Sequence, residues 1–196
     1  MKIAPEKGFA DLARDSQRVF RAVMNAMARP GSIVDIDAGL TPPEPLTAGA
    51  AALALALFDF ETPLWLDAAM SNEAARDYLR FHTGAPIVAA PERAAFALLA
   101  SPLGLPDLNS FSLGSLEYPD RSTTLIVQVR DLATDGSWRL SGPGVDGEAP
   151  FETAPLPRDF IARRAALRPL FPRGVDFIFV ANGRAAALPR TTLIEA

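Results

Sequence analysis

"DFIFVANGRAAALPRTT", residues 176–192, is the stretch that decides the class of fold. Two apolar runs of strand type flank the dipeptide Asn182-Gly183. Asn and Gly tolerate the positive φ angles of a type I′ turn, which is a favoured connection between antiparallel strands. The stretch therefore predicts an antiparallel β-hairpin.

Further strand signals lie upstream of this hairpin. Residues 123–132, "TTLIVQVRDL", give the clearest one because β-branched residues are frequent in it. Residues 32–37 alternate apolar and polar side chains, which indicates a half-buried strand. The segment "GSWRLSGPGVDG", residues 136–147, predicts a strand that ends in a Gly/Pro loop. Other apolar runs of strand type cover residues 62–67, 85–90 and 93–99.

Helical segments are interspersed with these strands. Residues 46–58 consist mostly of Ala and Leu and indicate a buried helix. Residues 71–84 predict an amphipathic helix with Ser71 as N-cap and Gly84 as its C-terminal stop. A late helix is expected within residues 158–174, and a short helix or turn within residues 106–114. The first helix, within residues 9–31, has one apolar face made of Leu12, Val19, Phe20, Val23, Met24 and Met27.

The order of these elements predicts an α/β fold in which helices flank a mixed sheet that ends in the antiparallel hairpin. The chain has 196 residues and 49% hydrophobic content, which suits one domain over residues 1–196. A chain of this length buries enough surface for a full core without disulfides or metals. Residues 1–8 are polar and are expected to form a flexible tail.

Charge and hydropathy bound the partners and the compartment. The formal net charge is −4, so the chain lacks the broad basic field that nucleic-acid binding requires. The most apolar run, Leu46 to Phe58, has 13 residues, whereas a bilayer span needs about 20. The N-terminal residues lack the apolar core of a signal peptide. We expect a cytoplasmic protein that contacts neither nucleic acid nor membrane.

The residue inventory also limits the chemistry. There is no Cys and one His, so a site of several thiolates or imidazoles cannot be built. A carboxylate Mg²⁺ site stays possible in principle, although no cluster of acids suggests one. Pyridoxal phosphate catalysis needs a Schiff-base lysine, and both lysines, Lys2 and Lys7, lie in the expected tail. We therefore expect no metal and no cofactor.

The single histidine, His82, allows two interpretations. It falls in the last turn of the expected helix, where a protonated imidazole complements the negative end of the helix dipole. Alternatively, His82 is a base in a ligand site with Arg80 and Thr83, which requires the helix to unwind near Thr83. A Ser-His-Asp triad would have to use His82, but the sequence contains no G-x-S-x-G elbow.

Two glycine- and arginine-rich segments are the other candidates. "SGPG", with Ser141, Gly142 and Gly144, is either a turn at a strand end or a backbone nest for an anion. "LPRTT", with Arg190 and Thr191, is either a strand edge or a set of anion donors. The late helix and its exit carry a group of arginines that either complements the helix dipole or binds phosphate or acidic partners: Arg163, Arg164, Arg168 and Arg173.

Seven blocks in a fixed order resemble one known family. The sequence is similar to the H subunit of the bacterial carbon–phosphorus lyase system, which degrades phosphonates. Residues 91–118 and the N-terminal tail match less well. The blocks are "QRVFRAVMNAMARPG" (17–31), "TPLWL" (62–66), "LRFHTGAP" (79–86), "TTLIVQV" (123–129), "RLSGPGV" (139–145), "FPRGVDFIF" (171–179) and "LPRTT" (188–192).

The resemblance implies a fold, partners and a role. It implies the fold of the large domain of pyridoxal-phosphate-dependent transferases, without the cofactor. It implies a homodimer when the subunit is isolated, and assembly with G, I and J subunits. That complex supports formation of α-D-ribose 1-methylphosphonate 5-triphosphate from ATP and methylphosphonate. The resemblance assigns no catalytic residue to the H subunit, so a domain that binds or converts a phosphonate or nucleotide by itself stays the alternative.

Overall fold

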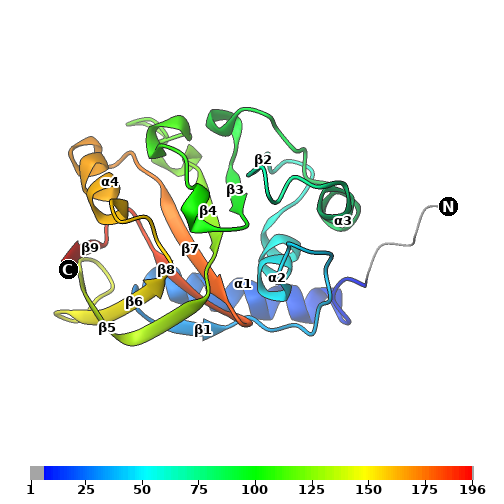
Figure 1. Cartoon of the computed structure of the whole chain (residues 1–196), viewed down its shortest axis with the longest axis horizontal. Coiled ribbons are helices and arrows are strands. Elements are labelled where there is room, and N and C mark those ends of the chain that lie inside the picture. Colours follow the sequence, from blue (N-terminus) through cyan, green and yellow to red (C-terminus); the bar gives the residue numbers. More distant parts are fainter. Residues whose placement is uncertain (1–6, 196) are drawn as a thin grey trace.

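The computed structural model describes residues 7–195 and has a six-stranded sheet at its centre (Figure 1). The strand order is β1-β8-β7-β4-β3-β2. Four neighbouring strands run parallel, namely β2 (Leu64–Leu66), β3 (Phe96–Leu99), β4 (Thr124–Gln128) and β7 (Asp176–Ala181). The two strands at the other edge are antiparallel, namely β8 (Arg184–Leu188) and β1 (Ile33–Asp35). The predicted mixed sheet is thus confirmed.

The predicted hairpin joins β7 to β8. Asn182 and Gly183 have φ angles of 49° and 72°, and Ala181 pairs with Arg184 across the turn. Both central residues of a type I′ turn need a positive φ, which explains why this dipeptide connects the strands.

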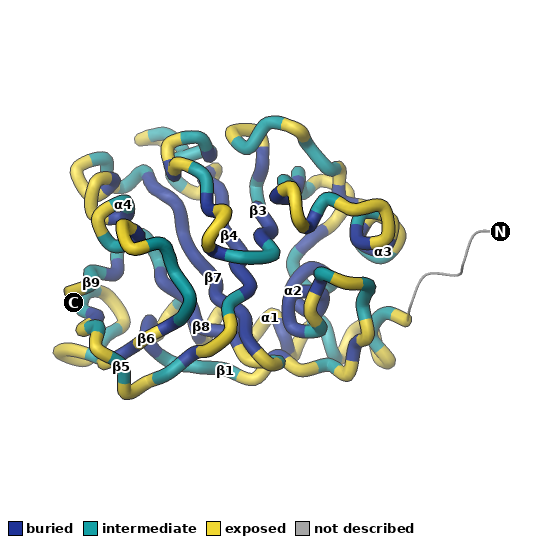
Figure 2. Tube along the Cα trace, in the orientation of Figure 1, coloured by how far each residue is buried: buried dark blue, intermediate teal, exposed yellow. Residues whose placement is uncertain are grey.

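The two faces of the sheet carry different layers. Along β7, Ile178 and Val180 face one core cluster, while Phe177 and Phe179 face another. This alternation follows from the two-residue period of a strand. The first face is covered by α1 (Leu12–Ala28), α2 (Ala48–Leu57) and α3 (Glu73–Thr83), and the second by α4 (Phe160–Leu167) and a small sheet. Figure 2 shows the buried strands between these layers.

The sequence pattern predicts only one of the three strands of the small sheet. It has the order β6-β5-β9, with β5 (Asp131–Ser141), β6 (Ala149–Ala154) and β9 (Leu193–Glu195). Only β5 follows from the sequence pattern, because β6 contains a proline and β9 has three residues. Trp138 of β5 stacks on Phe160 of α4 with ring centroids 6.0 Å apart, which ties this sheet to the second face.

Short helices complete the connections. Residues 106–114 contain one of them, as predicted. Within the described residues 7–195, no helix combines the length and apolar character that crossing a bilayer would take. The 3-10 helices are η1 (Pro91–Arg93), η2 (Pro102–Gly104), η3 (Leu108–Ser110), η4 (Pro119–Arg121) and η5 (Arg168–Leu170).

Two local predictions were wrong. Residues 85–90 are not a strand, since only Ile87 forms an isolated bridge to Leu64, and the prolines at 86 and 91 restrict pairing. The N-cap of α3 is Asn72 rather than Ser71, because the Asn72 side chain accepts a hydrogen bond from the Ala75 amide. The predicted stop at Gly84 is confirmed by its left-handed φ of 71°.

The apolar face of α1 is only partly buried. Val19 and Val23 lie in the core, but Leu12, Phe20 and Met24 are exposed. The helix buries the side centred on Val19, Val23 and Ala26, which is narrower than the predicted face. Most of the expected tail, residues 1–6, lies outside the described residues.

Candidate functional site

A pocket of about 320 Å³ opens between α4 and the segment that follows β8. This volume is at the lower end of the range for small-molecule sites, about 300–1,000 Å³. The walls come from α4, η5, the loop before β7 and the start of β9. The polar side chains in these walls are Arg164, Arg168, Arg173, Arg190, Thr191 and Thr192. This pocket is called the arginine pocket below.

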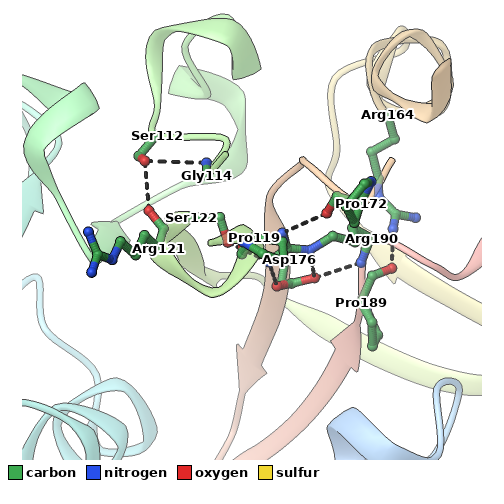
Figure 3. A network of polar contacts seen from close by, with 10 residues as sticks. All are labelled: Ser112, Gly114, Pro119, Arg121, Ser122, Arg164, Pro172, Asp176, Pro189 and Arg190. Atoms are coloured by element: carbon green, nitrogen blue, oxygen red, sulfur yellow. Dashed lines mark hydrogen bonds and ion pairs between the residues drawn. The ribbon is translucent and has the colours of Figure 1, made fainter. Parts of the chain in front are cut away.

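Arg190 is held by a network that uses its whole guanidinium group (Figure 3). Its Nε donates to Asp176 Oδ1 at 3.2 Å, and Nη1 donates to the carbonyls of Pro119 and Pro172 at 2.8 and 3.2 Å. Its Nη2 donates to Asp176 Oδ2 and to Ser122 Oγ. All the guanidinium donors are thus engaged, so Arg190 clamps loops together, and the prediction that it donates to an anion is not supported.

Arg164 lines the pocket, is nearly buried and has few partners. It is 9% exposed, and its Nη2 donates to the Pro189 carbonyl at 2.7 Å, as Figure 3 shows. Its guanidinium carbon lies 5.8 Å from the centre of the Phe177 ring. Burial lowers the pKa of Arg164 to about 10, and the negative charge of Asp176 partly opposes this shift. The side chain is therefore still a cation at neutral pH.

Two further pocket residues carry buried polar atoms whose hydrogen-bonding capacity is unused. Nε of Arg173 and Oγ1 of Thr192 are buried and have no hydrogen-bond partner within residues 7–195. Thr192 as a whole is 4% exposed. An unpaired buried polar atom costs roughly 1–3 kcal/mol, and both atoms belong to residues that line the pocket.

Positive charge in the pocket exceeds negative charge. Arg190 has Asp176 as its ion-pair partner. In the described part of the chain, no carboxylate lies within 4.0 Å of the charged groups of Arg164, Arg168 or Arg173. Arg163, the fourth arginine of the predicted group, instead pairs with Asp159 at 2.8 Å and does not line the pocket. The arrangement therefore attracts an anion.

The "SGPG" loop forms part of the pocket wall. Ser141 pairs with Leu193 of β9, and Pro143 lines the pocket. Gly142 has a φ of 121°, and a Cβ there would lie 2.8 Å from the Thr191 carbonyl oxygen. Gly144 packs against the Ala28 carbonyl at the end of α1, since a Cβ would lie 2.1 Å from that oxygen. The loop thus joins "LPRTT" to α1 by close backbone packing, as a turn at a strand end does.

Arg80, His82 and Thr83 lie elsewhere. They belong to α3, at the opposite end of the molecule from α4 and β9 (Figure 1). Helix α3 continues through Thr83, whose Oγ1 donates to the Leu79 carbonyl at 2.7 Å, so the helix does not unwind there. Arg80 is exposed on this helix. The structure does not combine these three residues with "SGPG" and Arg190 in one site.

His82 lies among aromatic rings at the end of α3. Its ring centroid is 4.4 Å from that of Tyr78 and 5.0 Å from that of Phe81. Gly8 lies against the same ring, because a Cβ at Gly8 would be 2.9 Å from His82 Nδ1. His82 is in the last turn of α3, where the helix dipole favours a cation. This placement fits the capping interpretation of His82.

Comparison with known proteins places the chain in a family. The profile of a family described as bacterial phosphonate metabolism protein (PhnH) matches residues 7–195. The chain belongs to the PhnH family. The resemblance drawn from the seven sequence blocks is thus confirmed.

Two curated proteins are similar to this PhnH-family chain. The α-D-ribose 1-methylphosphonate 5-triphosphate synthase subunit PhnH of Rhizobium meliloti is 39% identical over 187 residues, which cover 95% of this chain and 94% of the relative. The putative C-P lyase subunit protein HtxG of Stutzerimonas stutzeri is 35% identical over 83 residues, which cover 42% of this chain and 43% of the relative.

Part of the Arg190 network in this PhnH-family chain does not follow from the sequence. Arg164, Arg168 and Arg173, and Thr192 within "LPRTT", lie in segments that the sequence pattern singles out, but Asp176 and Ser122, which hold Arg190, do not. One feature of the sequence indicates a role for Asp176: it is the first residue of β7, and the other five residues of that strand are all apolar. Within the described residues, no group of three or more acids or histidines is arranged to hold a metal ion.

Proposed function

We propose that this protein is an accessory subunit of the carbon–phosphorus lyase core complex in phosphonate catabolism. In this role it supports formation of α-D-ribose 1-methylphosphonate 5-triphosphate from ATP and methylphosphonate. The observation that carries the proposal is the 39% identity with the Rhizobium meliloti synthase subunit over nearly the full length of both chains. We further propose a cytoplasmic location, which agrees with the use of ATP.

The proposed partners are a second copy of this chain and the G, I and J subunits. The exposed apolar side chains of α1 support a protein–protein surface on the first face of the molecule. Phe20 and Met24 are 48% and 52% exposed and lie one helical turn apart, with Leu12 further along the same helix. Neighbouring exposed apolar side chains of this size support an interaction surface on this helix.

The proposed fold relationship is to the large domain of pyridoxal-phosphate-dependent transferases, in one domain over residues 1–196. A largely parallel sheet with layers on both faces supports this relationship, and the two sheets share one core cluster. The proposal assigns no cofactor, because an internal aldimine needs a lysine and the chain has only Lys2 and Lys7, both before α1.

Complementation tests the proposed function. A Rhizobium meliloti strain that lacks its PhnH subunit would receive the gene for this protein and be grown with methylphosphonate as the sole phosphorus source. We expect growth, and we expect tagged protein to co-purify with the G, I and J subunits. Failure of both readouts, with the protein expressed and folded, would contradict the proposal.

The alternative function is a domain that binds or converts a phosphonate or nucleotide by itself. One observation favours ligand binding, namely the buried donors of the arginine pocket. Incubation of the isolated protein with ATP and methylphosphonate, followed by ³¹P NMR, tests for conversion. We expect no product without the partner subunits.

A further inference from the structure

The arginine pocket brings together donors that the protein itself does not use. Arg164, Arg173 and Thr192 come from three segments separated in the sequence, namely α4, the loop before β7 and the segment after β8. Arg173 Nε and Thr192 Oγ1 are buried without a partner in the described chain. Such atoms are normally paired in folded proteins, and both belong to residues that line one cavity, so an acceptor that enters it and shifts these side chains slightly would pair them.

The charge and shape of these donors favour a tetrahedral oxyanion. Guanidinium groups present N–H donors in a planar fork that matches phosphate oxygens, and a threonine hydroxyl adds a donor from another direction. Arg168 adds a third cation without a carboxylate partner in the described residues, and it is exposed. Arg168 is thus the most exposed arginine of the pocket, whereas Arg164 is buried.

The rest of the pocket wall is apolar. Ile161 and Leu167 come from α4, Phe171 follows η5, and Ile194 belongs to β9. Phe171 is 63% exposed, although a ring of this size normally packs against something. A volume of about 320 Å³ leaves room for a small substituent beside the oxyanion. The walls thus favour an anion with a short apolar group over an anion that is hydrated on all sides.

We propose that the arginine pocket binds the phosphonate group of a small alkylphosphonate, with Arg164, Arg173 and Thr192 around the oxygens and the apolar wall around the alkyl group. The oxyanion part stands on the geometry alone, whereas the choice of a phosphonate as the carrier rests on the proposed function. Arg190 acts as a positioning residue, because its network with Asp176, Pro119 and Pro172 fixes the loops that carry Arg173 and Thr192.

Isothermal titration of the full chain with methylphosphonate, inorganic phosphate and ATP tests this proposal. We expect saturable binding in the millimolar range or tighter, with methylphosphonate ahead of inorganic phosphate. Arg173→Met and Thr192→Val should each weaken binding by about tenfold or more, as expected for a hydrogen bond to a charged group. Thr192→Val keeps the side-chain shape and removes an unpaired hydroxyl, so it should fold normally.

The matched control is Arg158→Met. Arg158 is exposed just before α4 and does not line the pocket, so its replacement should change the affinity by less than about twofold. Absence of saturable binding of any of the three anions would overturn the proposal, as would equal affinity of wild type and Thr192→Val. Binding of ATP alone would overturn the choice of a phosphonate.

The titration tests the anion site separately from the growth complementation, which tests the proposed function. Growth complementation without anion binding would remove the pocket proposal and leave the subunit role intact. Anion binding without complementation would leave an oxyanion site and remove both the subunit role and the choice of a phosphonate.

Discussion

The end of α3 and the arginine pocket differ in how completely the surrounding protein packs against or hydrogen-bonds their polar and charged groups. At the end of α3, the single histidine of the chain lies between aromatic rings and beneath Gly8, in a helix whose cap and stop are both formed. In the arginine pocket, the nearly buried cation Arg164 and two buried atoms, Arg173 Nε and Thr192 Oγ1, have hydrogen-bonding capacity that the described chain does not fill.

This difference leads us to weigh unused hydrogen-bonding capacity above the rarity of a residue type as a guide to a ligand site. His82 is a candidate site residue because it is the single histidine of the sequence. Its surroundings give it packing and a favourable helix dipole, whereas the unpaired atoms of Arg173 and Thr192 leave a cost that a ligand can remove.

The largest loss of stability is expected for Arg190→Met, which removes the hydrogen-bond network of the Arg190 guanidinium beside the arginine pocket. The change removes the guanidinium partner of the Asp176 carboxylate, whose side chain is 12% exposed, and leaves it only the hydrogen bond from the backbone amide of residue 190 at 2.7 Å. An unpaired buried charge costs about 3–5 kcal/mol, so the free energy of unfolding should fall by about that amount. Urea denaturation followed by circular dichroism measures it.

The control for Arg190→Met is Arg130→Met. Arg130 and Asp131 also form an ion pair, but their side chains are 72% and 64% exposed. An exposed pair contributes about 0–1 kcal/mol, so this variant should be close to wild type. Equal stability losses in the two variants would refute the clamp.

A smaller effect is expected for His82→Ala at the end of α3. Loss of the ring contacts with Tyr78 and Phe81 should lower the free energy of unfolding by about 1 kcal/mol. Affinity for methylphosphonate should stay within about twofold of wild type, since α3 lies at the other end of the molecule. A loss of methylphosphonate binding with unchanged stability would instead make His82 part of a ligand site.

The smallest effect on stability is expected for Arg164→Met, although its effect on binding is large. Methionine fills similar space without a buried charge, so the free energy of unfolding should change by less than about 1 kcal/mol or even rise. Methylphosphonate affinity should fall by about tenfold or more. A large stability loss with unchanged affinity would show that Arg164 is structural.

The pKa of Arg164 adds a pH test to the same variant. Folding lowers the pKa of Arg164 to about 10, below that of an arginine in the unfolded chain, so above pH about 10 the unfolded chain holds a proton that the folded chain has released. Unfolding then takes up a proton, and stability rises with pH in this window relative to Arg164→Met. Below pH about 10 both states are protonated and the difference between wild type and variant should be constant.

The fold was more predictable than the site. The hairpin at Asn182-Gly183 and the buried Ala/Leu helix follow from local patterns, which residue propensities determine. The strand predicted over 123–132 is confirmed as β4 up to Gln128, whereas Asp131 and Leu132 already belong to β5. The three-residue strand β9 and the proline-containing β6 carry no such pattern and form because β5 lies between them. Which face of α1 is buried is set by neighbouring elements, so Phe20 and Met24 were misassigned.

The site depends on contacts between distant segments. The arginines near α4 and the "LPRTT" segment can be identified from the sequence. The sequence does not show that Asp176 forms an ion pair with Arg190, whereas Nε of Arg173 is left without a hydrogen-bond partner in the described chain. Such a division of roles among like residues arises only when β7, β8 and η4 meet in three dimensions.

A crystal structure of the protein with methylphosphonate tests the central claim most directly, because it locates the anion. We predict density for the phosphonate in the arginine pocket, with its oxygens within hydrogen-bonding distance of Arg173 Nε and Thr192 Oγ1 and its methyl group toward the apolar wall. A phosphonate bound beside His82, or an empty arginine pocket at saturating methylphosphonate, would contradict the account.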